Sequence, residues 1–551
     1  MKKMIALLLV LVMVLGMAAC AAEETNTAAS TGTETTSEST PAETEAPAES
    51  AAPAEAEPVT LHVAMQDSAA CEYLEGEDIT NNWWTKQYKE RFNVEIVTDW
   101  STNDADTYNT KINLAMVSGK LPDTFKVNSL VQLEQLVDAG LVMDLTEIFD
   151  EYASDLLKEL SYSDMDTFAT GMRDGALYGI AQMHYGWSTQ PYYLWLRNDW
   201  MVEQGFDGPE TIADLETIMQ TFVEEYGAWG YSVDKTLVQL NSLAPAWGAY
   251  PYIWVTNDNG VMEPGSIQPE MKETLATFAK WYANGWIDPN FTTYDYNAMN
   301  TAAVNGTSGA TAYQQWWGYV PGVDVVAQQG AEAIFYPYEI PKATTDVLYP
   351  ISFDNNGYTV VSKDCAHPEM VIELMNFYAE VFYGDEVDAG IQEFRDMNLN
   401  GYAHITGPFR TTDTMSEDRN LEQVSKAIAE NDPSYVTSVT AIGKYNGSMK
   451  WLNEQDSAGI GDYLQHGAGE HAAFQLAHNI IEEGRYITNG LWGKQPELMN
   501  TYGSTLDDLL LEGFTKIIIG EESIDYFDTL VANWRSAGGD AVIDAVNEMY
   551  G

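Results

Sequence analysis

Basic residues are scarce in this chain of 551 residues. Its 26 Lys and Arg are far outnumbered by 83 Asp and Glu, which gives a formal net charge of −57. A surface this acidic repels the phosphates of nucleic acids and anionic lipid head groups. Nucleic-acid binding and peripheral membrane binding are therefore not expected. The shortage of cations also argues against an acidic oligosaccharide as a ligand.

Cysteine is almost absent, with Cys20, Cys71 and Cys365 as its three occurrences. Their spacings match no metal or redox motif, and the chain has neither a phosphate-cradling Gly-Lys-Ser/Thr motif nor a Gly-x-Ser-x-Gly elbow. We therefore expect no cofactor and no bound metal. Cys71 and Cys365 are compatible with a long-range disulfide in an oxidising compartment, and equally with two separate thiols.

The first twenty residues have the pattern of an export signal. Lys2 and Lys3 precede an apolar run at residues 5–15, which is shorter than the roughly 20 residues of a membrane-spanning helix. Small residues then lead directly to Cys20. The segment resembles a bacterial lipoprotein signal, in which the cysteine is lipidated, for example with palmitate, and becomes the mature N-terminus. An ordinary secretory signal with an incidental cysteine is the alternative.

Residues 21–58 change abruptly in composition to Ala, Thr, Ser, Glu and Pro, without a basic or aromatic residue. Such a segment buries too little apolar surface to offset the entropy of ordering, so we expect a disordered tether. As a flexible coil it reaches on the order of 35 Å. A folded body would then stay near the membrane while remaining clear of it.

The folded part, residues 59–551, begins with alternating strands and helices. Residues 59–65, 94–97 and 122–127 read as strands, and helices are predicted to start near residue 81 and to cover residues 108–118. This β-α-β-α-β pattern predicts an α/β fold with a mostly parallel sheet. Ligands of such sheets bind beyond the carboxyl ends of the strands. The length of the chain favours two lobes or domains.

The chain resembles the family 1 extracellular solute-binding proteins, the substrate-binding lipoproteins of ABC importers for sugars and oligosaccharides. The order and spacing of many short segments carry this resemblance. These segments are residues 118–123, 138–146, 174–180, 196–200, 209–215, 282–289, 306–310, 358–363, 367–369, 517–520, 527–528 and 537–540.

The resemblance implies a two-lobed, periplasmic-binding-protein-like fold of type II, with hinge segments and a ligand cleft between the lobes. Lobe 1 is expected at about residues 59–180 plus about 350–470, and lobe 2 at about residues 185–345 plus the C-terminal helices. The first two hinge crossings are expected near residues 178–184 and 338–352. The C-terminal helices would cross once more.

The implied function is capture of a sugar or oligosaccharide and its delivery to the permease subunits of an ABC importer. The protein would be a monomer, anchored by lipid at Cys20 on the outer face of the bacterial membrane, and not an enzyme. A secreted, lipid-anchored glycoside hydrolase is the main alternative, and a solute sensor is another. Some relatives carry a calcium loop, but residues 224–234 lack its alternating oxygen ligands, so none is expected here.

Sugar sites pair aromatic platforms with planar polar side chains. Trp195 is expected in the core, as is one of Trp316 and Trp317, and the other of that pair is expected on the ligand. The aromatic candidates for ligand contact are Trp83, Tyr185, Trp187, Trp247, Tyr250, Trp316 and Trp317. The polar candidates are Asp67, Asn82, Asp123, Asn128, Asp354 and Asn355. A structural cap is the alternative role for Asp123, and a turn is the alternative for residues 354–357. Packing in the core is the alternative for Trp247 and Tyr250, which lie beside Gly and Pro.

Overall fold

The computed structural model describes residues 57–67, 71, 73–184, 186–344, 346–352, 355–384, 387–396, 406–491, 493 and 495–550. The predicted signal with Cys20, most of the predicted tether, Tyr185 and Asp354 lie outside the described residues. Two large hydrophobic cores divide the described chain into two lobes. Lobe 1 is built on the core around Trp84 and Val360, and lobe 2 on the core around Trp195 and Phe278.

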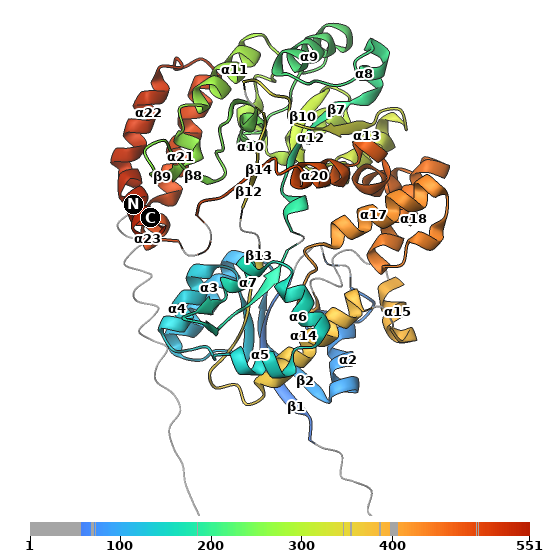
Figure 1. Cartoon of the computed structure of the whole chain (residues 1–551), viewed down its shortest axis with the longest axis vertical. Helices are drawn as coiled ribbons and strands as arrows, with labels where there is room; N and C mark the ends of the chain where they lie inside the picture. The colour runs from blue at the N-terminus through green and yellow to red at the C-terminus, as the bar shows by residue number, and fades with distance from the viewer. Residues whose placement is uncertain are drawn as a thin grey trace, which may run out of the picture. The chain divides into compact units, whose positions relative to one another are not determined.

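Lobe 1 is organised by a five-stranded sheet of order β2-β1-β3-β13-β6 (Figure 1). The strands β1 and β2 pair in parallel, as do β1 and β3, whereas β13 is antiparallel to both β3 and β6. The strands are β1 (Val59–Gln66), β2 (Val94–Thr102), β3 (Thr124–Val127), β6 (Ile180–Met183) and β13 (Asn355–Val361). The predicted β-α-β-α-β order of the first strands is confirmed.

Local signals set the helices between these strands. The helix α2 (Trp83–Phe92) begins with a capping box formed by Asn82 and Thr85. The helix α3 (Ala105–Ser118) is capped by Asp104 and ends at Gly119, whose φ of 65° suits glycine. The remaining elements of lobe 1 are α4 (Leu130–Asp138), α5 (Thr146–Tyr152), α6 (Asp155–Tyr162), α7 (Met165–Ala169), β4 (Met172–Arg173), β5 (Ala176–Leu177), α14 (Pro368–Tyr383) and α15 (Ala389–Asp396).

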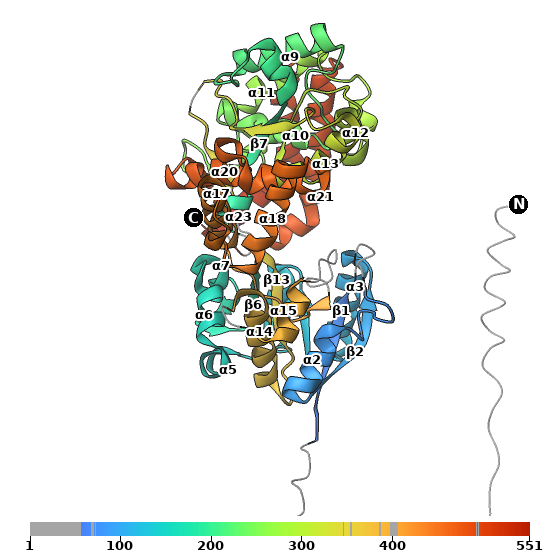
Figure 2. The same cartoon turned by 90° about the vertical axis from the view of Figure 1, so that its right-hand side faces the viewer.

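Lobe 2 contains a three-stranded antiparallel sheet of order β10-β7-β11. Its strands are β7 (Tyr192–Arg197), β10 (Ala310–Gln314) and β11 (Phe335–Tyr338). Helices from two parts of the chain complete this lobe, as the green and red ribbons around β7 show in Figure 2. The first group is α8 (Asn198–Gln204), α9 (Ile212–Tyr226), α10 (Val238–Leu243), α11 (Met271–Ala283), α12 (Tyr296–Val304) and α13 (Gly322–Gln329). The second group is α17 (Ser416–Glu430), α18 (Val439–Glu454), α19 (Ile460–Asp462), α20 (Ala473–Glu482), α21 (Glu497–Ile518), α22 (Tyr526–Trp534) and α23 (Asp540–Tyr550).

The chain passes between the two cores three times. It leaves the lobe 1 sheet after β6 and enters the lobe 2 sheet at β7, so the first crossing is residues 184–191. It returns between β12 (Tyr349–Ile351) and β13. The third crossing lies between Phe409 of the lobe 1 core and Leu421 of the lobe 2 core. The first crossing starts later than predicted because β6 occupies residues 180–183 as a buried strand of lobe 1.

The predicted lobe boundary near residue 470 is corrected by the packing of α17, α18 and α19. Leu421, Trp451 and Ile460 belong to the core of lobe 2, although the sequence placed them in lobe 1. These helices bury their apolar faces against elements of lobe 2, such as α13 and α20. Two smaller pairings extend the same lobe, the antiparallel pair β8 (Trp254–Thr256) with β9 (Met262–Pro264) and the parallel pair β12 with β14 (Tyr486–Thr488).

Candidate functional site

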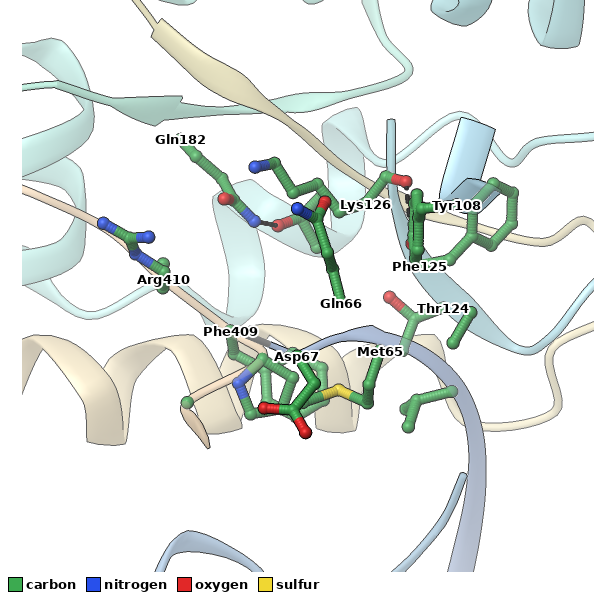
Figure 3. Close-up of a pocket in the computed structure, with 15 residues that line it drawn as sticks. Met65, Gln66, Asp67, Tyr108, Thr124, Phe125, Lys126, Gln182, Phe409 and Arg410 are labelled. Atoms are coloured by element: carbon green, nitrogen blue, oxygen red, sulfur yellow. Dashed lines mark hydrogen bonds between the residues drawn. The ribbon is translucent and has the colours of Figure 1, made fainter. Parts of the chain in front are cut away.

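A hollow opens at the carboxyl ends of β1 and β3, where we expected ligands to bind. Its polar lining includes Gln66 at the end of β1, Asp67 directly after it, Lys126 on β3, Gln182 on β6, and Arg410 at the start of the third crossing (Figure 3). We call it the lobe 1 hollow. Sheet topology assembles it, because β3 lies between β1 and β13, and β13 lies beside β6.

The two cations of the lobe 1 hollow influence each other. Burial, together with the positive charge of Arg410, lowers the pKa of Lys126 to about 8. The Nε of Arg410 is buried without a hydrogen-bond partner. Asp67 accepts a hydrogen bond from Tyr73 Oη at 2.6 Å, and burial and this bond raise the pKa of Tyr73. The hollow therefore presents two cations with unused donor capacity.

A second hollow lies where the crossings meet lobe 2, and we call it the hinge hollow. Its polar lining includes His184, Gln190, Gln314, Gln315 and Ser352. Gln182 of the lobe 1 hollow and His184 of the hinge hollow are two residues apart at the end of β6, a span of roughly 7 Å in an extended chain. The end of β6 thus contributes to both hollows, which we together call the cleft region.

Aromatic rings form one wall of the hinge hollow. The rings of Tyr192 and Tyr252 stack with centroids 5.6 Å apart and planes 16° apart. Trp316 lines the same hollow and packs on Tyr313 and Tyr296, with centroid distances of 4.9 and 5.4 Å. Flat apolar rings beside side-chain amides are the combination that binds the C–H faces and hydroxyl edges of sugars.

The local fold turns two adjacent tryptophans in opposite directions. Strand β10 ends at Gln314, and residues 315–318 form one turn of 3₁₀ helix. Trp316 donates from Nε1 to Gln314 Oε1 at 3.1 Å and remains partly exposed. Trp317 is 0 % exposed, packs on Trp195, and donates to Asn300 Oδ1 at 3.1 Å. One member of the pair therefore belongs to the cleft region and the other to the core.

The family description "Bacterial extracellular solute-binding protein" matches residues 76–380, which is more than half of the chain. The chain belongs to this family. Among curated relatives, lipoprotein LipO of Bacillus subtilis (strain 168) is 22 % identical over 481 residues, covering 83 % of this chain and 86 % of LipO.

Solved structures of two sugar-related binding proteins share the fold of this solute-binding protein. The HMO-binding, ABC-transporter-associated protein of Bifidobacterium longum infantis has a TM-score of 0.62 at 14 % identity, covering 90 % of this chain and 98 % of that one. The N-glycan transport protein NgtS of Streptococcus pneumoniae has a TM-score of 0.54 at 15 % identity, covering 89 and 98 %. The predicted family and the two-lobed α/β fold are thus confirmed.

Of the predicted ligand contacts in this solute-binding protein, two line the hollows described above. Asp67 lines the lobe 1 hollow and Trp316 the hinge hollow. Trp187 lines a separate hollow beside Met165 and Met415, and its ring lies 5.2 Å from that of Tyr486. Binding by these residues remains a prediction.

Two amides lie at the same edge of the lobe 1 sheet without lining either hollow. Asn128 follows β3 and donates from Nδ2 to Asn109 Oδ1 at 2.9 Å. Asn355 opens β13 and accepts from the Gly357 amide at 3.1 Å, which is the local role that a turn requires. Their contact with a ligand also remains a prediction. Tyr185 and Asp354 lie outside the described residues.

Several residues predicted to contact the ligand have structural interactions within the lobes. Asn82 is fully buried as the N-cap of α2. Trp83 stacks on Phe394 at 3.9 Å within lobe 1. Asp123 precedes β3 and accepts from the His62 amide of β1 at 2.8 Å, so its carboxylate bonds to the backbone of the neighbouring strand. Trp247 and Tyr250 are buried, in agreement with the alternative that they pack in the core, and Trp317 is the member of its pair that is in the core.

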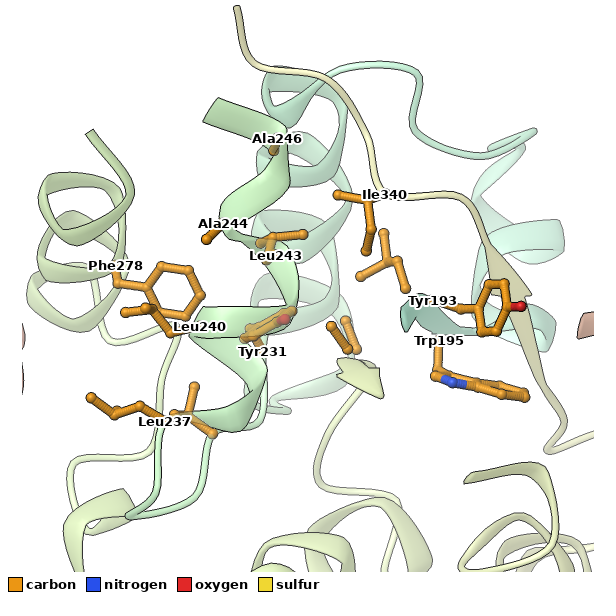
Figure 4. Packing of buried hydrophobic residues seen from close by; sticks show 14 of the residues in the cluster. Tyr193, Trp195, Tyr231, Leu237, Leu240, Leu243, Ala244, Ala246, Phe278 and Ile340 are labelled. Atoms are coloured by element: carbon orange, nitrogen blue, oxygen red, sulfur yellow. The ribbon is translucent and has the colours of Figure 1, made fainter. Parts of the chain in front are cut away.

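The expectation that Trp195 belongs to the core is confirmed. Figure 4 shows its ring among buried residues of lobe 2, including Tyr193 and Ile340.

Cys365 is a buried free thiol that forms no disulfide with Cys71, and burial raises the pKa of its thiol to about 11. Within the described segments, no group of three His, Cys, Asp or Glu side chains is arranged to hold a metal. None of the helices described is long and apolar enough to cross a membrane.

Sequence reasoning missed most of the polar lining of the two hollows. Lys126 carried a signal, since a lysine between Phe125 and Val127 interrupts an otherwise buried strand. Tyr192 and Tyr252 were not among the predicted contacts, although both line the hinge hollow. Arg410 belongs to no recognisable motif. It lines the hollow together with Lys126 of β3 because the third crossing starts there.

Proposed function

We propose that this protein captures a sugar or oligosaccharide in the cleft region formed by the lobe 1 hollow and the hinge hollow. The observation that supports this most directly is the aromatic wall of Tyr192, Tyr252 and Trp316 beside the amides of Gln190, Gln314 and Gln315. Apolar ring faces and amide edges together complement a sugar, whereas either feature alone is common in any protein.

The proposed mechanism is closure of two lobes around the solute. Three crossing segments connect the cores, and lining residues come from lobe 1, lobe 2 and the crossings themselves. A solute that contacts both lobes stabilises the closed state by as much as its affinities for the two states differ. The closed form would deliver the solute to the permease subunits of an ABC importer. No bond is broken in this mechanism, which distinguishes it from that of a glycoside hydrolase.

We further propose that the chain is held at the outer face of the bacterial membrane by lipid on Cys20, with residues 21–58 as a tether. The lipoprotein signal pattern supports this, and the curated relative LipO is named a lipoprotein. Tethering would raise the concentration of the receptor at its importer without any new contact.

Calorimetry with a panel of neutral mono- and oligosaccharides tests the central proposal. We expect stoichiometric binding of at least one sugar, weakened roughly tenfold or more by Trp316→Ala. Trp286→Ala is the matched control, because Trp286 is a partly buried tryptophan of lobe 2 that lines neither hollow. Release of shorter sugars during incubation would favour the hydrolase instead, and binding unchanged by Trp316→Ala would remove the aromatic wall from the site.

A further inference from the structure

We propose that the lobe 1 hollow is an anion subsite in which Lys126 and Arg410 bind a carboxylate or sulfate of an acidic sugar residue. This inference rests on the proposed function and narrows it to acidic oligosaccharides. The scarcity of Lys and Arg in the sequence, by contrast, favoured a neutral ligand over an acidic one. What matters for binding is where those cations lie.

Arg410 differs from every other arginine in the described part of the chain. Arg91, Arg173, Arg197, Arg419, Arg485 and Arg535 each form an ion pair with a carboxylate, and Arg395 donates to three backbone carbonyls. Within the described residues Arg410 has neither a hydrogen bond nor an ion pair, and its Nε is buried. Although the chain has 83 acidic residues, none of those described pairs with Arg410, so its guanidinium is available to an anion from outside the protein.

Lys126 brings a second positive charge to the same hollow. Its ammonium group has no ion pair among the described residues, and it is near enough to Arg410 for the two charges to repel each other. Two unneutralised cations at a partly buried site raise the free energy of the empty state. An incoming anion would relieve this repulsion and accept hydrogen bonds from both groups.

Asp67 is an acidic residue that also lines the lobe 1 hollow, and its carboxylate is hydrogen-bonded to Tyr73. Its carboxylate accepts from Tyr73 Oη at 2.6 Å, and it is not among the groups that shift the pKa of Lys126. A guanidinium binds a planar carboxylate through two parallel N–H bonds, which makes Arg410 suited to such a group.

The neighbouring amides favour a sugar as the carrier of the anion. Gln182 donates from Nε2 to Thr359 Oγ1 at 2.9 Å, and its Oε1 is buried without a hydrogen-bond partner. Figure 3 shows the side chains of Gln66 and Gln182 directed to the same part of the hollow as Lys126. Amide oxygens accept from hydroxyl groups, so a hydroxyl-bearing ring with an acidic substituent fits better than a bare inorganic anion.

The experiment compares acidic trisaccharides with their uncharged counterparts on the full-length chain. Calorimetry is run with trisaccharides of galacturonate, glucuronate and mannuronate, each beside its methyl ester, and with 6-O-sulfated neutral trisaccharides. We expect at least one acidic form to bind roughly tenfold or more tighter than its uncharged counterpart. Preference for uronates would assign the group as a carboxylate, and preference for sulfated sugars as a sulfate.

Variants connect that preference to the two cations. Lys126→Met and Arg410→Gln should each reduce the preference for the acidic form over its uncharged counterpart to about threefold or less. Lys120→Met is the matched control, since Lys120 is an exposed lysine of lobe 1 that lies outside the hollow. Should a variant fail to fold, the salt dependence of the unmodified protein provides a second test, because only an ionic contact loses affinity steeply with added salt.

Three outcomes separate the two proposals. If both variants lose the preference for the acidic sugar over its uncharged counterpart, the anion subsite is supported. Equal binding of acids and esters, unchanged in the variants, overturns the subsite and leaves sugar binding standing. Failure of every acidic and neutral sugar to bind overturns the proposed function, and the subsite with it.

Discussion

The side-chain amide of Gln190 is bonded to the backbone of Ser352 in both directions. Gln190 Nε2 donates to the Ser352 carbonyl at 2.8 Å, and the Ser352 amide donates to Gln190 Oε1 at 2.7 Å. Gln190 belongs to the first crossing and Ser352 follows β12 at the second, so this pair joins two crossing segments. Under the proposed closure of the lobes, it would couple two of the segments that connect them.

The Gln190 pair leads to a prediction about closure. Gln190→Ala should broaden the distribution of distances between spin labels on the two lobes and weaken solute affinity by roughly three- to tenfold, since two hydrogen bonds are lost. Pulsed electron paramagnetic resonance and calorimetry measure these effects. Ser352→Ala is the control, because both bonds use the main chain of Ser352. An unchanged distance distribution in Gln190→Ala would remove the pair from the hinge.

The adjacent tryptophans should separate binding from stability. Trp317→Ala leaves a cavity in the core of lobe 2 and should lower the free energy of unfolding by roughly 3 to 5 kcal/mol. Trp316→Ala should cost much less stability but weaken solute binding. Urea unfolding and calorimetry on both variants test this contrast, and the reverse pattern would exchange the two assignments.

The charged form of Lys126 should lower the free energy of unfolding. Its pKa of about 8 lies below that of an unfolded lysine, so the unfolded chain binds this proton more tightly. The cost is therefore fully present below about pH 8 and disappears as the pH rises toward 10.5. Lys126→Met should then be more stable than the parent by roughly 1 to 3 kcal/mol at pH 7.

Urea unfolding of Lys126→Met and its parent at pH 7 and pH 10.5 provides the measurement. Asp67, Tyr108 and Arg410 also line the hollow and are present in both proteins, so the difference reports the charge of Lys126 together with its effect on these neighbours. A gain in stability that stays the same at both pH values would arise from apolar packing of the substituted side chain alone, and would contradict the electrostatic account.

A buried network in lobe 2 should control stability in acid. Glu417 Oε2 lies 2.8 Å from Nε2 of the fully buried His466. Burial alone would raise the pKa of Glu417, but the His466 hydrogen bond and the charge of Lys444 lower it to about 2. Because this pKa lies below its unfolded value, the stability is present above about pH 4.5 and is lost as the pH falls toward 2.

Glu417→Gln tests the network. Its deficit in free energy of unfolding relative to the parent should be roughly 2 to 3 kcal/mol at pH 7 and should shrink between pH 5 and pH 2. Glu422→Gln is a control for general charge effects, because Glu422 is an exposed acid on the same helix. A deficit independent of pH would show that packing, and not the charge, is what Glu417 contributes.

Cys20 should decide where the protein resides. Cys20→Ala should release the protein from the membrane fraction into the medium, with solute affinity unchanged, because the lipid and not the folded body provides the anchor. Fractionation followed by immunoblotting measures the distribution, and calorimetry the affinity. Retention of the variant in the membrane fraction would contradict lipid anchoring at this residue.

The local patterns of the sequence predicted lobe 1 well. Alternation in residues 59–65 and the stop at Gly119 depend on neighbours in the chain, and the strands and helices formed as expected. The boundary of the lobes was less predictable. Residues 421–460 carry helical patterns compatible with either core, and only packing selected lobe 2.

The candidate site shows the same division. The sequence indicated an aromatic platform at residues 316–317, but the 3₁₀ turn decided that Trp316 faces the hollow and Trp317 the core. Asn82 and Asp123 were plausible ligand contacts by residue type, yet Asn82 caps α2 and Asp123 bonds to the backbone of β1. A polar side chain near a strand or helix end can cap the backbone or bind a solute, and its type alone does not distinguish the two roles.

By itself, the sequence determined the family, the α/β class, the export signal pattern and an acidic surface, because these follow from residue order and composition. Only the tertiary structure decided that Lys126 and Arg410 share one hollow and that Gln190 bonds to Ser352. Each of these pairs is distant in the chain and carries no motif. Their proximity arises from the order of strands in one sheet and from three crossings between two cores, which no local pattern records.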